Sequence, residues 1–504
     1  MALVKTNNIS LQVAIEASLG VLPGSPTWAL LEPNTINSFG STITKVARNP
    51  ISKLRQRRKG TTTDIESGVE FEADLTGEHF ITFAEGFVFA SFTSIVELRA
   101  GAAFSTLAAT AVPTFTHSAL SAAIAQNTLL YARGWTNVGN NGLKVVGAGG
   151  TTTTTPIGSA LTAETPTQAS NARVSVAGFR SAVGDVDITV SGTTGTLSST
   201  VLDFTTLGLT VGQLIHIGGL TSTNQFASGR FGAARITSIA TNALGLDKIR
   251  TTPAATALQT EANTTQALDI LFGRFLRNVD VDHASFLERS FQFEVAYPDL
   301  SSVGVDGYEY AEGNYGDTMS INLPGQDKAT VTFGFVGTDT DVATTSRASG
   351  ASTPLIPVQT VAYNTSTDLA RLGLVNSTQD SLSVCFKSLT LTLANGVTAE
   401  KCLGSLGALG LNTSNFLVDL EAQATFDNVE ITEAIRNNET VTIDFVLKNG
   451  DGAIAIDVPA MTLGGGDKEF PVGETVLINA TGEAFADPTL QTSVGISLFP
   501  VYPQ

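Results

Sequence analysis

The chain has 504 residues, a formal net charge of −18 and only 15% charged residues. This length exceeds what one hydrophobic core usually supports, so we expect several domains. The acidic balance argues against duplex DNA or an anionic membrane as the main ligand, because both are polyanions. Cys385 and Cys402 are too few for a disulfide framework, and the N-terminus lacks the pattern of a signal peptide. We therefore expect a protein that stays in the cytoplasm until it is assembled.

The first sixty residues hold a proline-punctuated, loop-like leader over 21–28 and then a dense cluster of positive charge. Up to Gly60 the chain has 8 Lys and Arg against two acids, whereas the remainder has 20 against 44. The basic residues of the cluster are Lys45, Arg48, Lys53, Arg55, Arg57, Arg58 and Lys59. We call the segment 41–65 the arm.

Three interpretations of the arm are open. It is a nucleic-acid patch, a solvated loop tip, or a contact for the acidic body of the next copy of the chain, which would build a polymer. The cluster has no interleaved aromatic residues for base stacking and no recognisable reading helix. We therefore favour the contact between protein copies.

A strand and a helix are predicted directly after the arm. Apolar and acidic residues alternate from Glu66 to Leu75, which predicts a strand with one buried face and one wet face. The wet face would carry Glu70, Glu72 and Asp74. Thr76 is a suitable N-cap for the following helix. The apolar stripe of this helix would consist of Phe80, Phe83, Ala84 and Phe87.

From 104 to 267 the sequence becomes rich in Ala, Thr and Ser, which indicates an insertion. Two segments within it, 129–136 and 214–221, look alike at an offset of 85 residues, and each precedes a further strand-like run. This pattern predicts two small β modules or two halves of one barrel, and chance similarity between short β runs is the alternative.

Alternation then resumes in a strand over 291–297 and in a hairpin of 319–323 with 329–336. A Ser/Thr/Pro-rich stretch over 338–360 is predicted as a linker or exposed loop. The remaining predicted strands are 388–394, 416–426, 440–447, 453–458, 475–480 and 493–499, with one short helix over 429–437.

The order of strands, one helix and a return hairpin occurs twice, which favours a duplicated domain. The fold class is therefore mainly β, with two tandem β-sandwich domains that each carry a flanking helix, an inserted small β domain and an extended N-terminal arm. The predicted domains are 1–103 together with 268–345, the insertion 104–267, and 346–504.

No catalytic or metal-binding pattern is found. The four histidines, His79, His117, His216 and His283, lie in separate segments without ligands at metal-binding spacing. Asp280 and Asp282 beside His283 resemble a metal pair, but an exposed strand face is the favoured interpretation. Residues 449–452 fit a hairpin turn better than a calcium loop. We expect no enzyme activity, no cofactor and no metal.

The residues nevertheless suggest a family. They are the leader segments 15–20, 23–28 and 31–34, the basic runs 48–52 and 55–60, the strand and helix over 66–90, and the closing segment 495–500. Together they resemble the tail tube, or major tail, protein of long-tailed bacteriophages, in the large two-domain type from flexible, non-contractile tails.

This resemblance implies β-sandwich subunits whose sheets join edge to edge around a ring, with arms reaching the adjacent ring. A chain with two such domains would close as a homotrimer of pseudo-hexameric character. The insertion would decorate the outside. The lumen would pass double-stranded DNA during ejection without specific binding, and Glu70, Glu72 and Asp74 are possible lumen acids.

The resemblance further implies a location in the virion tail. The implied partners are other copies of the chain and the tape-measure, tail terminator and tail-tip proteins, with no membrane. The alternative function is a surface adhesin or carbohydrate-binding protein of tandem β domains, which two tryptophans support poorly. A nucleic-acid-binding protein that uses the arm is a third hypothesis.

Overall fold

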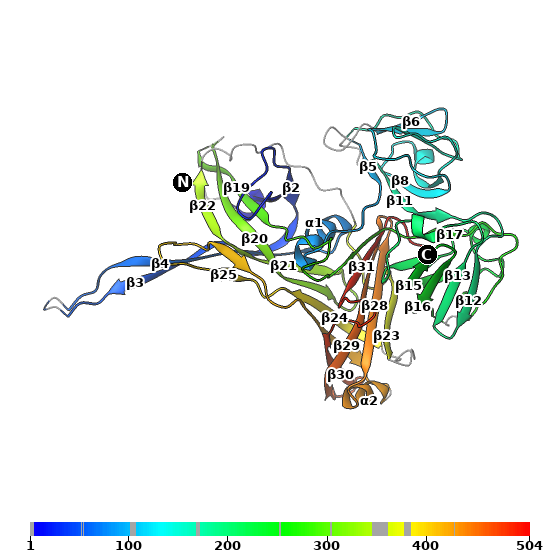
Figure 1. The fold of residues 1–504 in the computed structure, drawn as a ribbon. Coiled ribbons are helices and arrows are strands. Elements are labelled where there is room, and N and C mark those ends of the chain that lie inside the picture. The colour runs from blue at the N-terminus through cyan, green and yellow to red at the C-terminus, as the bar shows by residue number, and fades with distance from the viewer. Residues whose placement is uncertain are drawn as a thin grey trace.

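The protein was analysed as a computed structural model, which describes residues 5–51, 53, 55–100, 107–167, 172–250, 254–302, 305–344, 361–376, 385–427 and 429–503. Strands dominate these residues, and two α-helices, α1 and α2, accompany them. The predicted mainly β fold is confirmed. A two-stranded ribbon extends far from the body, and the insertion lies on the other side of the molecule (Figure 1).

The first half of the body surrounds α1. Its elements are β1 (Ser10–Ile15), β2 (Trp28–Leu31), β3 (Pro33–Arg48), β4 (Arg58–Asp74), α1 (Gly77–Val88), β19 (Phe291–Ser302), β20 (Val305–Leu323), β21 (Thr330–Gly337) and β22 (Asp339–Thr344). The predicted helix is confirmed, because the Thr76 hydroxyl accepts a hydrogen bond from the backbone N–H of His79 and the four stripe residues are buried. The prediction of a linker over 338–360 was wrong for β22, which pairs with β20, and 345–360 lies outside the described residues.

The second half repeats this order of elements. It contains β23 (Leu369–Asn376), β24 (Cys385–Ala394), β25 (Thr398–Glu400), β26 (Gly410–Asn412), β27 (Leu417–Thr425), α2 (Glu430–Arg436), β28 (Thr440–Asn449), β29 (Gly452–Glu469), β30 (Leu477–Ala484) and β31 (Gly495–Phe499). The six predicted strands and the predicted helix of this region are confirmed. The helix follows four strands in the first half and three strands in the second, apart from the additional hairpin of β25 and β26, and four further strands follow the helix in each half.

The insertion forms its own sheets between α1 and β19. Its strands are β5 (Glu97–Arg99), β6 (Leu107–Thr110), β7 (Thr114–His117), β8 (Thr128–Arg133), β9 (Gly142–Val145), β10 (Thr154–Pro156), β11 (Arg173–Arg180), β12 (Asp187–Ser191), β13 (Thr194–Ser198), β14 (Leu214–Ile217), β15 (Gly232–Ala240), β16 (Ala243–Asp247) and β17 (Asp269–Leu271). Two separate buried clusters fill it, yet β17 and β11 join the two parts in one 10-stranded sheet. β18 (Arg274–Arg277) already pairs with β31 of the body.

The two halves of the body share one long sheet because β20 pairs with β24. The order of the strands is β3-β4-β21-β20-β24-β27-β30-β29, with four strands from each half. The register is regular at the junction, where Met319 lies opposite Leu393 and Ile321 lies opposite Leu391. We call these eight strands the inner sheet.

One face of the inner sheet is buried in a single core that spans both halves. Phe83 of α1 lies at the centre of this core, with its ring centroid 4.8 Å from that of Phe333 and 5.7 Å from that of Phe71. Gly86 of α1 allows the close approach of Phe291, because a Cβ atom there would lie 2.4 Å from that ring. The helix therefore covers the sheet through aromatic packing.

The second part of the insertion docks on the second half through buried ion pairs. Asp457 of β29 binds Arg235 of the insertion at 2.9 Å and also pairs with Lys248. Its cross-strand neighbour Asp444 pairs with Arg371 of β23, whose guanidinium in turn donates a hydrogen bond to the Lys248 carbonyl of the insertion at 3.1 Å. Burial raises the pKa of Asp444, but the neighbouring guanidinium of Arg371 outweighs it and keeps this pKa below its usual value. Buried charges are tolerated only when they are paired, so these contacts fix the orientation of the docked part.

We predict that Phe83→Ala lowers the free energy of unfolding of the subunit by about 3–5 kcal/mol, because it leaves a cavity in the aromatic core. Chemical denaturation of the unassembled subunit measures this change. Phe470→Ala is the control and should stay within about 0.5 kcal/mol of the wild type, since Phe470 is 73% exposed. Equal losses in the two variants would contradict this account of the core.

Candidate functional site

The exposed face of the inner sheet carries continuous rows of polar residues. Because directly paired residues point to the same side of a sheet, the register defines these rows. One row runs through Glu72, Thr332, Ser320, Thr392, Asp419, Glu483 and Thr462. The next row runs through Asp74, Thr330, Asn322, Thr390, Glu421, Thr481 and Gly464. Neither row contains Lys or Arg, so the face is polar and acidic.

The acids that the sequence suggested lie at one end of this face. Glu70, Glu72 and Asp74 project from β4, opposite the buried residues of the same strand, as the alternation predicted. Asn37 donates a hydrogen bond to Glu70 at 2.8 Å. Burial raises the pKa of Asp74, but the hydrogen bond from Asn34 and the ion pair with Lys328 at 2.7 Å outweigh it and lower this pKa overall. The ionised form of Asp74 is therefore stabilised.

A second group of acids on the same face was not identified from the sequence. Asp419 of β27 lies directly opposite Glu483 of β30, and Glu421 follows on the same face of β27. Burial and then the charges of Glu483 and Glu421 raise the pKa of Asp419. Like charges at directly opposite positions destabilise a sheet, so this arrangement costs stability. The alternation in β27 predicted a strand, but sequence alone does not place β27 beside β30.

The arm is the far part of the β3–β4 ribbon (Figure 1). Lys45 and Arg48 lie on β3, Arg58 and Lys59 lie on β4, and Lys53, Arg55 and Arg57 lie in the connection between them. All seven side chains are exposed, and within the described ranges no ion pair involves any of them. The structure thus brings the predicted basic residues together at the tip of the ribbon.

The arm also exposes apolar side chains. Ile43, Val46 and Ile51 are 50%, 55% and 107% exposed. An isolated two-stranded hairpin is at best marginally stable in water, because nothing covers its faces. In the described part of the chain, other elements support the ribbon near its base, where Lys401 binds Asp64 at 2.7 Å and Ile65 donates a backbone hydrogen bond to Leu406. Both the positive charge and the exposed apolar residues of the arm therefore favour contact with another molecule.

The titratable side chains outside the two polar rows and the arm were also located. Among them, no group of three or more His, Cys, Asp or Glu side chains is arranged to hold a metal ion. Asp280 and His283 lie in an exposed turn, closed by a hydrogen bond from the His283 N–H to the Asp280 carbonyl, and not on the strand that was expected. Cys385 and Cys402 are exposed and free. Neither described helix is long and apolar enough to cross a membrane.

Comparison with known proteins gives one match. A family model described as phage tail tube protein matches residues 6–484. A search of curated proteins finds none that matches. The matched range includes the arm, the insertion and all eight strands of the inner sheet.

We predict that Glu483→Gln stabilises the subunit by about 0.2–1 kcal/mol at neutral pH, because it removes a like charge opposite Asp419. The folded-state pKa of Asp419 is raised above its ordinary 3.8, so the wild type is more stable below 3.8 and loses this stability as the pH rises through the folded pKa. The advantage of the variant should therefore vanish at low pH. Denaturation curves at several pH values measure it.

Glu70→Gln is the matched control, because Glu70 faces Gly334 and not an acid across the strand pair. This variant should show no gain in stability at neutral pH. A gain equal to that of Glu483→Gln would mean that general negative charge, and not the opposed pair, sets the cost.

Proposed function

The chain belongs to the phage tail tube protein family, since the family model covers nearly its whole length, and from this premise we propose that copies of it close into rings whose inner wall is the polar face of the inner sheet. Such a protein is a structural subunit of the virion tail, a non-enzymatic kind of protein. The observation that carries the proposal is the continuous polar face of the inner sheet, whose rows cross seven strands and contain acids but no Lys or Arg, backed by one core.

An acidic wall suits the passage of a genome. Duplex DNA carries dense negative charge and binds tightly to surfaces that offer Lys and Arg. The rows described above offer carboxylates and hydroxyls instead, so they repel the DNA backbone within a Debye length of about 8–10 Å. The proposed channel would therefore let DNA slide through during ejection without holding it.

We propose that three copies form one ring. The first tube domain then consists of residues 1–103 together with 268–345, and the second consists of residues 346–504. The insertion, 104–267, lies outside the ring. Each chain would supply two equivalent units of four inner strands, giving a pseudo-sixfold ring. The subunit would be located in the host cytoplasm before assembly and would meet the tape-measure, tail terminator and tail-tip proteins in the tail.

The pairing of β20 with β24 inside the chain is our model for the proposed pairing between copies. Among the described residues, the outer edge of β3 has no strand partner, and β29 pairs only with β30 beyond Thr462. In the repeated order of elements, β3 corresponds to β24 and β29 corresponds to β20. Because β20 pairs with β24 within the chain, we propose that β29 of one copy pairs with β3 of the next.

The repeat also supports a particular register for this proposed contact. The strand before each helix ends equivalently, since Leu75 donates to the Ala329 carbonyl and Phe426 donates to the Val476 carbonyl, both at 2.9 Å. Counting along the paired strands from these two points makes Lys468 equivalent to Ile321 and Phe39 equivalent to Leu391. Ile321 lies opposite Leu391, so Lys468 would lie opposite Phe39 of the next copy.

The same equivalence between strand residues places Phe470 in the proposed contact between copies. Phe470 is equivalent to Leu323, which is 6% exposed and lies opposite Leu389 at the internal junction. Leu389 in turn corresponds to Ile36 of β3. Phe470 is 73% exposed in the single chain, and in the proposed ring it would lie opposite Ile36 of the neighbour. Its burial would favour association through the hydrophobic effect.

The arm is proposed to couple one ring to the next. Its seven basic residues carry the cluster of positive charge of a chain whose net charge is −18, so the acidic body of a copy in the adjacent ring attracts it. Docking would also cover the exposed apolar residues Ile43, Val46 and Ile51.

Electron microscopy of the purified protein tests the function directly. Stacked rings or tubes with a central channel are the expected result. A persistent monomer at high concentration, even when tail initiator proteins are added, would overturn the proposal.

The register of ring closure is tested by cross-linking. In a background of Cys385→Ser and Cys402→Ser, we predict that Phe39→Cys with Lys468→Cys gives disulfide-linked oligomers that end at a closed trimer, because opposed strand residues lie within disulfide reach. Non-reducing electrophoresis of assembled tubes measures the linkage. Phe39→Cys with Thr481→Cys is the control and should not link, since Thr481 lies on β30, one strand in from the edge. Intact tubes without linkage in the first variant would mean that other edges close the ring.

The arm is tested by charge reversal. We predict that Arg55→Glu, Arg57→Glu and Arg58→Glu together leave the fold intact but reduce tube length at low salt, because repulsion replaces attraction between rings. The difference from the wild type should shrink as salt rises. Lys at the same three positions is the control and should retain assembly. Tubes of unchanged length in the Glu variant would exclude an electrostatic role for the arm.

A further inference from the structure

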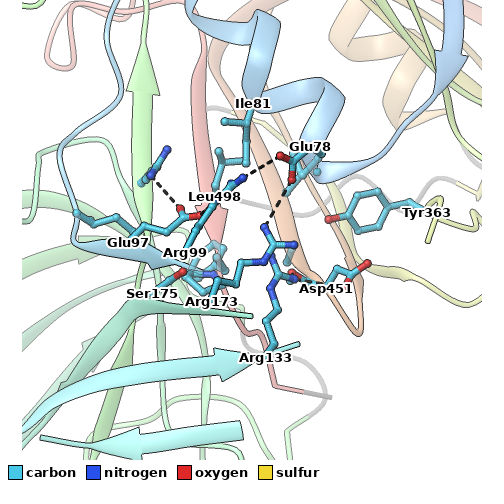
Figure 2. A pocket seen from close by; sticks show the side chains of 18 residues that line it. Glu78, Ile81, Glu97, Arg99, Arg133, Arg173, Ser175, Tyr363, Asp451 and Leu498 are labelled. Atoms are coloured by element: carbon cyan, nitrogen blue, oxygen red, sulfur yellow. Dashed lines mark hydrogen bonds and ion pairs between the residues drawn. The ribbon is translucent and has the colours of Figure 1, made fainter. Parts of the chain in front are cut away.

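Three arginines lie side by side where the insertion meets the body (Figure 2). Arg99 of β5 and Arg133 of β8 are both paired directly with Arg173 of β11, which lies between them. Positive charges at directly opposite positions of a sheet repel one another. This arginine row therefore needs negative charge close to it.

Two carboxylates compensate one end of the row. Glu97 accepts hydrogen bonds from Arg99 at 2.6 Å and from Arg274 of β18 at 2.9 Å. Glu78, in the first turn of α1, accepts one from Arg99 at 3.0 Å. Burial alone would lower the pKa of Arg99, but Glu97 and Glu78 outweigh it and raise this pKa. Arg99 is therefore well compensated.

The other end has less negative charge. Asp451, in the turn between β28 and β29, lies 3.4 Å from Arg133 through its Oδ1 atom, and its Oδ2 atom accepts the backbone N–H of Val361. Thus three carboxylates face the four guanidinium groups of Arg99, Arg133, Arg173 and Arg274, and each carboxylate already has a partner. The cluster has one positive charge in excess.

Arg173 is the arginine of this cluster whose positive charge is least compensated. Its side chain is 6% exposed. Among the residues that the structure describes, its Nε has no hydrogen-bond partner and its one ion pair is a long contact of 3.5 Å to Glu78. Burial, together with the charges of Arg133 and Arg99, lowers the pKa of Arg173 to about 10. A buried guanidinium with an unsatisfied donor is costly unless an acceptor reaches it.

A cavity of about 60 Å³ lies beside this guanidinium. Arg133, Arg173 and Ser175 line it from the insertion, and Tyr363 directs its hydroxyl group toward it from the body (Figure 2). One water molecule needs about 10–15 Å³ of such space, so there is room for one small anion.

We propose that this cavity binds one small inorganic anion, chloride or a tetrahedral oxyanion such as phosphate, on Arg173. The anion neutralises the excess charge and accepts the unpaired Nε–H. Because the cavity is lined by α1, by the insertion and by the turn at Asp451, the bound anion ties the insertion to the body. This site is independent of the proposed ring, since it involves neither the inner face nor the free edges.

Thermal unfolding of the full chain tests the site at constant ionic strength with three sodium salts. Chloride or phosphate should raise the unfolding midpoint above that in gluconate, which is too large for the cavity, and the rise should saturate with concentration. Arg173→Met should lose this anion-specific rise. Arg277→Met is the matched control, because Arg277 also lies on a strand near the junction but bonds the Leu490 carbonyl outside the cavity, and it should keep the full rise.

Two results would overturn the proposal. One is the same response to all three anions in the wild type and in Arg173→Met, which would show general salt effects alone. The other concerns crystals of the wild type soaked in bromide, where an anomalous peak beside Arg173 is expected. Its absence would reject the site even if Arg173→Met does not fold.

Discussion

The pairing of β20 with β24 is the contact on which the rest of the architecture depends. It merges two four-stranded units into one sheet, so the polar residues of both halves share a face and the apolar residues of both halves share a core. It also occupies one edge of each half, so among the described residues the outer edge of β3 and the outer edge of β29 beyond Thr462 have no strand partner. An exposed sheet edge invites aggregation unless it is protected or used. Here the two remaining edges match the pair already joined inside the chain, so their exposure is consistent with controlled self-association.

The polar face of the inner sheet contains an arrangement of acids that lowers the stability of the single chain. Asp419 opposite Glu483 is unfavourable for the single chain, and no neighbouring cation in the rows relieves it. The stability comes from the opposite face, where Phe71, Phe83 and Phe333 pack in one aromatic cluster. This separation onto two faces leaves the exposed residues free to serve the proposed channel while the buried residues stabilise the fold.

Much of the fold could be predicted because its strands alternate clearly. Val69, Phe71 and Ala73 against Glu70 and Glu72 identify β4 without any structure, and the stripe of α1 is equally plain. The arm was recognised by its charge but not as a ribbon, since β3 is exposed on both faces over 41–48 and has no alternation to read. Two charged groups were missed for another reason: the acids Asp419 and Glu483, and the row of Arg99, Arg133 and Arg173. These residues come together only because their strands are neighbours in the sheet, and local alternation does not predict which strands pair or in which register.

The insertion lies in a link that is a short connection in the second half, so the fold tolerates extra residues there. In the second half, α2 and β28 are separated by residues 437–439, whereas in the first half the corresponding link between α1 and β19 holds the whole insertion. This link is remote from the order of inner strands, so added residues do not disturb the register of the sheet. A flexible tether would leave such modules free to rotate, yet here the buried pairs of Asp457 with Arg235 and Lys248 and the contact of Arg173 with Glu78 restrict them. Because each buried charge requires a particular partner, only one orientation satisfies both groups at once. Every copy in an assembled ring would therefore present its insertion at the same angle to the sheet, which makes the outer surface as regular as the inner one.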